Sequence, residues 1–282
     1  MKTTVKTVEK QNKKTIVEKQ KKTVNIAGRE YKLKKSKYCV NYSPVHVSDN
    51  MSGKMEFIPA ISTSIALNTI CQSRQHVSGS ICENCYAQAI YERYSENADG
   101  TQAAFAAACD SNYYLLIGSV LPYELLPEFK AGVQIARIEA FADVQNETQA
   151  ENYVNIIKKN PHVIFGWWSK NIDIIDKVMQ RTGKPKNLVL IQSSMFINRP
   201  ENKRSEFVDK VFTVYNDAFL RELDIIKECL SRLQETNKKA AKKAVQDIFE
   251  RYFINCGGRA CNACRQCYNT ENKTENIKER LK

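Results

Sequence analysis

Seven of the ten cysteines in this 282-residue chain fall into two groups with metal-ligand spacing. The downstream group has four intervening residues after its first thiol and two after each of the next two, and Gly257 gives its backbone freedom to turn. The first of these spacings are typical of plant-type ferredoxins, although four thiolates also suit zinc. We therefore expect a metal centre, an iron-sulfur cluster or alternatively zinc, at Cys256, Cys261, Cys264 and Cys267.

The upstream group supplies only three thiols, at Cys71, Cys82 and Cys85. Three ligands leave one iron of a four-iron (4Fe-4S) cluster open to another molecule, as a catalytic cluster requires. The alternative is a zinc ribbon, in which Cys82 and Cys85 pair with Cys264 and Cys267. The upstream group is therefore predicted to be the reactive centre if the metal is iron.

The positive charge is concentrated at the start of the chain. The formal charge is +12, and residues 1–37 carry thirteen basic residues against three acidic ones. We expect residues 1–30 to be a flexible basic arm that is a candidate for contact with nucleic acid, residues 31–251 to be an α/β barrel-like domain, and residues 252–282 to be a Cys-rich cluster-binding tail. Neither a secretory signal nor an apolar run of about 20 residues is evident, which predicts a cytoplasmic protein with reduced cysteines and no membrane contact.

Short apolar segments alternate with helix-like segments along the predicted domain, a pattern typical of βαβ units. A parallel sheet forming a full or partial (β/α) barrel is the expected α/β architecture, and an open doubly wound sheet is the alternative. We expect helices over residues 148–159, 172–181 and 218–251. Strands are predicted at residues 113–120, 133–141, 163–168, 188–192 and 208–214.

Polar residues that follow the predicted strands are candidate cofactor ligands, because a parallel barrel builds its active site at the carboxyl ends of its strands. The alternative is that they cap loops or form ion pairs. Arg137 is expected to be a paired structural ion, and only one of Trp167 and Trp168 can face the core from a strand. The candidates are Glu139, Asp143, Trp168, Ser169, Lys170, Gln192 and Ser193.

Three stretches together resemble the phage-encoded gene-product-eighty-eight proteins, which are similar to radical S-adenosylmethionine (SAM) enzymes. They are IPAISTSIALNTIC leading to CENCYA, ARIEAFADV followed by NPHVIFGWWSK, and CGGRACNACRQCY. The resemblance implies a radical-SAM-like barrel with one cluster at each cysteine group, and SAM as the cofactor. Ten residues separate Cys71 from Cys82, where a standard radical SAM motif has three, and Ala142-Asp143 stands where Gly-Asp is expected.

Two hypotheses of different classes follow. The first is an iron-sulfur enzyme that performs one-electron chemistry on an unknown substrate with help from an electron donor, in the host cytoplasm if the chain is phage-encoded. The second is a noncatalytic zinc protein that uses its basic arm and cysteine modules to bind nucleic acid or a host protein. The identity of the metal separates them.

Overall fold

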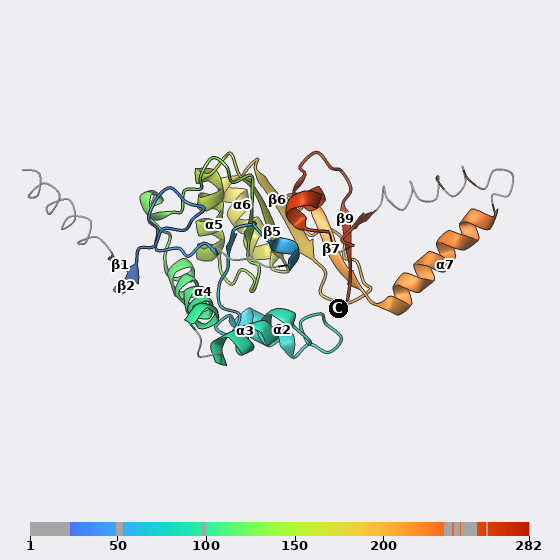
Figure 1. Cartoon of the computed structure of the whole chain (residues 1–282), viewed down its shortest axis with the longest axis horizontal. Coiled ribbons are helices and arrows are strands. Elements are labelled where there is room, and N and C mark those ends of the chain that lie inside the picture. Colours follow the sequence, from blue (N-terminus) through green and yellow to red (C-terminus); the bar gives the residue numbers. More distant parts are fainter. Residues whose placement is uncertain are drawn as a thin grey trace, which may run out of the picture.

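A seven-stranded parallel sheet flanked by helices forms the centre of this α/β protein (Figure 1). The computed structural model describes residues 23–48, 53–96, 100–233, 239, 243, 253–257 and 259–281. The sheet order is β3-β4-β5-β6-β7-β9-β8, and every neighbouring pair is parallel. The strands are β3 (Ala60–Ile61), β4 (Ile135–Ile138), β5 (Ile164–Ser169), β6 (Leu188–Ser193), β7 (Lys210–Tyr215), β8 (Phe253–Asn255) and β9 (Asn276–Arg280).

Two helices connect the central strands as the sequence predicts. Helix α5 (Glu147–Lys159) links β4 to β5, and α6 (Ile172–Thr182) links β5 to β6. The side chain of Asn146 caps α5 by accepting a hydrogen bond from the backbone N–H of Gln149 at 2.8 Å. Helix α6 ends at Gly183, whose φ of 73° is a conformation that glycine adopts without strain. These two helices and strands β4 to β7 are therefore confirmed.

The strand predicted at residues 113–120 is wrong, because this segment is the last part of helix α4 (Gly100–Gly118). Cys109, Asn112, Tyr113 and Leu116 are all buried, and they recur at helical spacing. A helix buried on most of its circumference carries an apolar run that resembles a buried strand when only a few residues are considered. Helix α4 begins well before this apolar run, and its length distinguishes it from a strand.

Segments near both ends of the chain form regular structure that the predicted domain boundaries assign to the arm and the tail. Strands β1 (Thr23–Ile26) and β2 (Arg29–Lys32) form an antiparallel hairpin, and residues 1–22 of the predicted arm lie outside the described residues. Strands β8 and β9 of the predicted tail complete the large sheet. Helix α7 (Asp217–Leu233) confirms the start of the predicted helix over residues 218–251, most of whose remainder lies outside the described residues.

The sheet has two differently covered faces. Side chains of α5 and α6 pack with Phe165 and Trp167 in the largest hydrophobic cluster. Trp168 faces the opposite side, where Tyr268 and the downstream cysteine segment cover the sheet. The two tryptophans therefore point to opposite faces, as predicted. Arg137 makes no ion pair within the described residues, contrary to expectation; its guanidinium lies over the Trp168 ring at 4.4 Å.

Four further helices precede β4 or follow β8. Helices α2 (Thr69–Gln75), α3 (Tyr86–Glu96) and α4 lie between β3 and β4, and α9 (Cys261–Cys264) lies between β8 and β9. Three single 3-10 turns, η1 (Gly53–Met55), η2 (Tyr123–Leu125) and η3 (Gln266–Tyr268), complete the described elements. In Figure 1, α2 and α3 lie below the sheet, and the red segment that contains α9 lies at the upper right, beside β6, β7 and β9.

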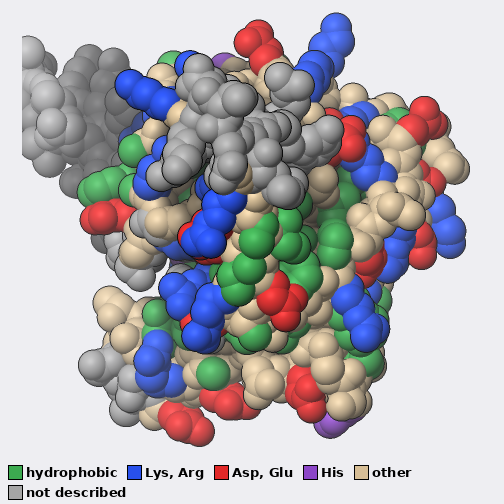
Figure 2. Space-filling view, turned by 90° about the vertical axis from the view of Figure 1, so that its right-hand side faces the viewer, with side chains coloured by type: hydrophobic (Ala, Val, Ile, Leu, Met, Phe, Trp, Pro, Cys, Tyr) green, Lys and Arg blue, Asp and Glu red, His purple; other side chains and the backbone are tan. Residues whose placement is uncertain are grey.

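The surface mixes side-chain types. Figure 2 shows one face on which hydrophobic side chains gather near the centre, with Lys and Arg side chains beside them. Within the described part of the chain, no helix has the length and apolar character needed to cross a membrane.

Candidate metal centres

The upstream cysteines lie in the connection that leaves β3, the first strand of the sheet along the chain. Cys71 is in the first turn of α2, and its backbone N–H donates to the capping side chain of Asn68 at 3.0 Å. Cys82 and Cys85 precede α3 in the following turn. Because β3 pairs in parallel with β4, this connection starts at the carboxyl edge of the sheet.

Asp143 ties the upstream group to the carboxyl ends of β4 and β5. Its carboxylate accepts hydrogen bonds from the Ser169 hydroxyl at 2.5 Å and from the Lys170 backbone N–H at 2.8 Å. It also pairs with Arg74 of α2 at 3.1 Å, and both side chains are largely shielded from solvent. Arg74 donates in addition to Asn171. This network fixes α2, and with it Cys71, against the ends of two strands.

The environments of the three upstream thiols overlap. Cys71 and Cys85 pack against the same small hydrophobic cluster, which includes Tyr91. Burial raises the pKa of the Cys71 thiol, and the nearby Asp143 carboxylate raises it further. Burial also raises the pKa of Cys82, while the Lys170 ammonium acts in the opposite direction. A thiolate here therefore needs a positive partner, which a bound metal supplies.

A backbone contact holds the Cys82 loop over the next strand. The N–H of Ile81 donates to the carbonyl of Met195 at 3.0 Å, and Ser80 forms an isolated bridge with Phe196. Met195 and Phe196 follow directly after β6. The loop thus extends from the end of β3 across the edge of the sheet to the end of β6.

The predicted cofactor ligands divide between this edge and structural roles. Asp143, Ser169 and Lys170 converge beside the upstream cysteines. Glu139 is buried, and its carboxylate accepts hydrogen bonds from Thr63, Gln149 and Tyr153. Burial raises the pKa of Glu139, although the hydrogen bonds from Thr63 and Tyr153 act to lower it. In this structure the Glu139 carboxylate therefore joins the segment after β3, through Thr63, to helix α5, through Gln149 and Tyr153.

The other predicted cofactor ligands, Gln192, Ser193 and Trp168, lie in three different environments. The Gln192 amide donates to the Asn202 carbonyl at 2.9 Å and accepts from the Arg204 N–H at 2.8 Å, so it secures the connection from β6 to β7. Ser193 is the last residue of β6 and is nearly buried. Trp168 lies over the face of the sheet that the downstream group covers. Their predicted role in cofactor binding stays a prediction.

The downstream cysteines line one small hollow of about 30 Å³. Cys256 follows β8, Cys261 and Cys264 bound α9, and Cys267 lies in η3. Arg265, with φ of 51°, reverses the chain between α9 and η3. Burial and, to a smaller extent, the other three thiols raise the pKa of Cys267 to about 12. The four sulfurs are therefore neighbours, as the spacing predicts.

A lysine and an aromatic residue flank the downstream group. The ammonium of Lys54 lies 3.5 Å from the Cys256 sulfur and pairs with Glu279. The Tyr268 ring meets the Trp168 ring edge-on, with 5.6 Å between the ring centroids. The Tyr268 hydroxyl is buried and has no hydrogen-bond partner among the described residues. The ring lies above Gly166, where an added Cβ would stand 2.7 Å from it.

Within the described ranges, no three His, Cys, Asp or Glu side chains are arranged to hold a single metal ion. The two cysteine pairs of the alternative zinc ribbon occupy different places: Cys82 and Cys85 lie at the edge beside Lys170, and Cys264 and Cys267 lie over a face of the sheet. The donor sets are nevertheless all-thiol, and thiolates select iron-sulfur clusters and zinc. A cluster binds each thiolate to a different iron, so its ligands need not converge on one point.

A family comparison matches residues 7–276, a range that contains both cysteine groups and nearly all of the sheet. The chain belongs to the gene product 88 family. The comparison with curated proteins and that with solved structures found no match. The resemblance predicted from the three sequence stretches is thereby confirmed at the level of the gene product 88 family.

Sequence reasoning missed several residues that position the two groups of this gene product 88 protein. Arg74 lies three residues after Cys71, and this spacing places both on one face of a helix. Tyr268 directly follows Cys267, and Gly166 interrupts a strand of bulky residues, which often marks a close approach. Lys54 gives no comparable signal, because its partners lie more than 200 residues away in the chain.

Proposed function

We propose that this chain is an iron-sulfur protein and a radical-SAM-like enzyme, in which Cys71, Cys82 and Cys85 hold a 4Fe-4S cluster. The observation that carries the proposal is the gathering of three thiols at the carboxyl edge of a parallel sheet. That edge is where parallel α/β folds place their active sites. A bound cluster would supply one-electron transfer to a ligand at its open iron.

The strand order supports a partial barrel around this site. From β3 to β7 the strands follow one another in chain order, whereas a doubly wound sheet reverses its order part-way. A sheet that advances in one direction is typical of a barrel segment. We therefore prefer the partial barrel to the doubly wound alternative.

Lys170 is the residue that we assign to ligand binding at the upstream site. Its backbone N–H is held by Asp143, while its ammonium acts on the Cys82 thiol. The ammonium therefore lies near Cys82, one of the three thiols that would hold the cluster. A carboxylate of SAM or of a substrate is a suitable partner for it. Asp143 and Arg74 would position this lysine and α2 and would not bind the ligand themselves.

The downstream group would hold an auxiliary cluster that exchanges electrons with the reactive one. Tyr268 follows Cys267, and its ring contacts Trp168. Trp168 in turn precedes Ser169 and Lys170, which lie at the upstream site. The ring pair of Tyr268 and Trp168, together with the chain that continues from Trp168 to Lys170, thus connects the downstream group with the upstream site. An external electron donor would deliver its electrons at the downstream end.

Metal analysis tests the proposal most simply. We expect protein purified without oxygen to be brown and to carry iron with acid-labile sulfide. Cys229→Ala is the matched control, because Cys229 is exposed on α7 outside both groups, and it should leave the iron content unchanged. Colourless protein with stoichiometric zinc and no sulfide would contradict the proposal and favour the noncatalytic zinc protein, whose partner could be nucleic acid bound by the basic arm.

A further inference from the structure

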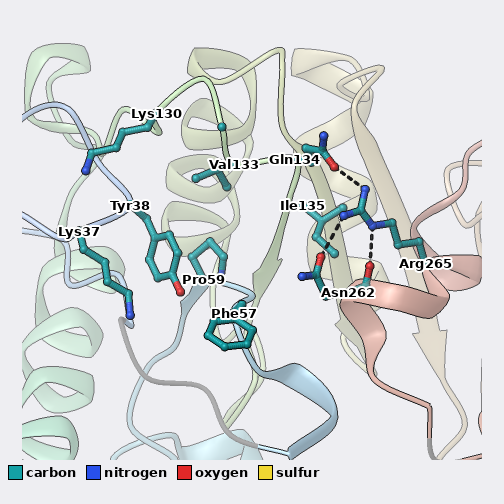
Figure 3. Close-up of a pocket in the computed structure, with 11 residues that line it drawn as sticks. Lys37, Tyr38, Phe57, Pro59, Lys130, Val133, Gln134, Ile135, Asn262 and Arg265 are labelled. Atoms are coloured by element: carbon teal, nitrogen blue, oxygen red, sulfur yellow. Dashed lines mark hydrogen bonds between the residues drawn. The ribbon is translucent and has the colours of Figure 1, made fainter.

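A second hollow, of about 310 Å³, lies at the amino ends of β3 and β4, on the opposite edge of the sheet from the upstream cysteines (Figure 3). Pro59 precedes β3 and Gln134 precedes β4, and both line it. Buried Ile135 contributes to its floor, while Asn262 and Arg265 of the downstream segment form the facing wall. The hollow is therefore separate from the proposed reactive site.

The hollow is positively charged. Lys37, Lys130 and Arg265 line it, and no Asp or Glu is among the described lining residues. Among the described residues, Arg265 donates only to neutral oxygens, those of Asn262 and the amide of Gln134 (Figure 3). None of the three cations forms an ion pair within the described part of the chain. The hollow therefore suits an anionic group such as a phosphate.

Two aromatic rings give the same hollow a flat apolar surface. Tyr38 is half-buried, and Phe57 is 66% exposed, which is high for so large an apolar side chain. Phe57 also has φ of 64°, a conformation that is rare for bulky residues and costs about 1 kcal/mol or more. Both rings and Pro59 lie on the same side of the hollow in Figure 3. Exposed rings beside cations are typical of sites that stack nucleic-acid bases.

The positive surface continues beyond the hollow along the chain. Between residues 29 and 42 there are five basic residues and one acidic residue. Lys32, Lys34 and Lys35 in this segment are exposed. Tyr42 is 62% exposed, and the Lys35 ammonium lies over its ring at 5.8 Å. The alternating basic and aromatic side chains therefore form a longer surface than the binding of a single nucleotide requires.

We propose that this hollow and its basic margin bind single-stranded nucleic acid. A base stacks on Phe57 or Tyr38, and Lys37, Lys130 and Arg265 contact the adjoining phosphates. Stacking accepts any base, so the site has little sequence preference. The proposal does not depend on the cysteine groups holding clusters, and it places the contact in the folded body of the chain, whereas the earlier expectation placed it in the arm.

The test measures binding of a fluorescein-labelled oligothymidylate to the full chain by anisotropy. Phe57→Asn removes the ring while asparagine accepts the same backbone conformation, so the fold is retained. It should weaken binding about tenfold or more. The matched control is Tyr123→Ala, another aromatic residue that is 61% exposed and lies near a lysine, but outside the hollow. It should bind as the unchanged protein does.

A charge series separates this site from the arm, which every variant retains. Lys37→Gln with Lys130→Gln should weaken binding and reduce its dependence on salt. Lys177→Gln with Lys186→Gln removes the same charge from exposed positions elsewhere and should have little effect. Equal binding by Phe57→Asn and the unchanged protein, equal effects of the two lysine pairs, or duplex binding as tight as single-strand binding would each overturn the proposal.

Discussion

The two cysteine groups are held against the same sheet by different kinds of interaction. The upstream group depends on hydrogen bonds and an ion pair that converge on Asp143, at the edge of the sheet. The downstream group is anchored mainly by packing, in which Tyr268 and Cys267 lie against the apolar face. A polar network leaves charged groups beside the thiols for ligand binding, whereas a packed segment holds its thiols in a fixed frame. This contrast supports the proposal that the upstream group is the reactive centre and the downstream group the auxiliary one.

The largest expected effect concerns the packed anchor. Gly166→Ala places a Cβ 2.6 Å from the Trp168 ring and 2.7 Å from the Tyr268 ring, so at least one ring must move. We expect the free energy of unfolding to fall by about 1–3 kcal/mol, as for other overpacked cores. Urea unfolding followed by fluorescence measures this change. In protein that carries metal, the spectrum of the downstream centre should change more than that of the upstream centre.

Gly118→Ala is the control for this substitution, because nothing lies within 4 Å of the added Cβ and Gly118 needs no positive φ. Its free energy of unfolding should stay within about 0.5 kcal/mol of the unchanged protein. If Gly166→Ala were as stable as Gly118→Ala, Tyr268 would not be packed tightly on the sheet, and the contrast between the two anchors would be lost.

A smaller effect concerns the polar anchor. Glu139 accepts hydrogen bonds from Thr63 in the connection that carries the upstream cysteines. Burial raises the pKa of Glu139 in the folded protein above its unfolded value of about 4.3. Its contribution to stability is then fully present below that unfolded value and is lost as the pH rises through the raised folded pKa. Glu139→Gln keeps the shape and removes the titration.

The measurement is the free energy of unfolding as a function of pH. Between the unfolded and folded pKa values, the stability of the unchanged protein should fall with rising pH relative to Glu139→Gln. Glu271→Gln, at an exposed loop position, should follow the unchanged protein. Parallel curves for the unchanged protein and Glu139→Gln would mean that Glu139 does not couple pH to the upstream connection.

Much of the fold could be predicted because its signals are local. Strands β4 to β7 are short apolar runs, and helices α5 and α6 between the first three of them show helical periodicity, an Asn cap before α5 and a terminal glycine after α6. Strand β3 has only two residues, β9 is defined by pairing with β7, which lies far away in the chain, and β8 is defined by pairing with β9. The sequence predicts a strand at the end of helix α4 because this buried end has no polar face. Strand pairing between distant parts of the chain, and a helix end that is buried on all sides, are hard to recognise from a short stretch of sequence.

The cysteine groups were visible in the sequence because ligand spacing is itself local. Their supports were not, since Asp143 meets Arg74 across 69 residues and Tyr268 meets Trp168 across 100. The same polar residues after strands gave mixed results: Asp143 and Lys170 lie beside the thiols, whereas Glu139 and Gln192 bond to their own connections. The spacing of the cysteines identifies the candidate metal ligands, whereas the residues that hold these cysteines in place are recognised only in the folded structure.

Electron paramagnetic resonance of the reduced protein, recorded with and without SAM, tests the division of roles most directly. In Cys85→Ala we expect the SAM-dependent change to disappear while the downstream cluster signal remains. In Cys264→Ala we expect the downstream signal to be lost and the SAM-dependent change to persist. Loss of every cluster signal in both variants would contradict two separate centres and would indicate one centre shared by both ends of the chain.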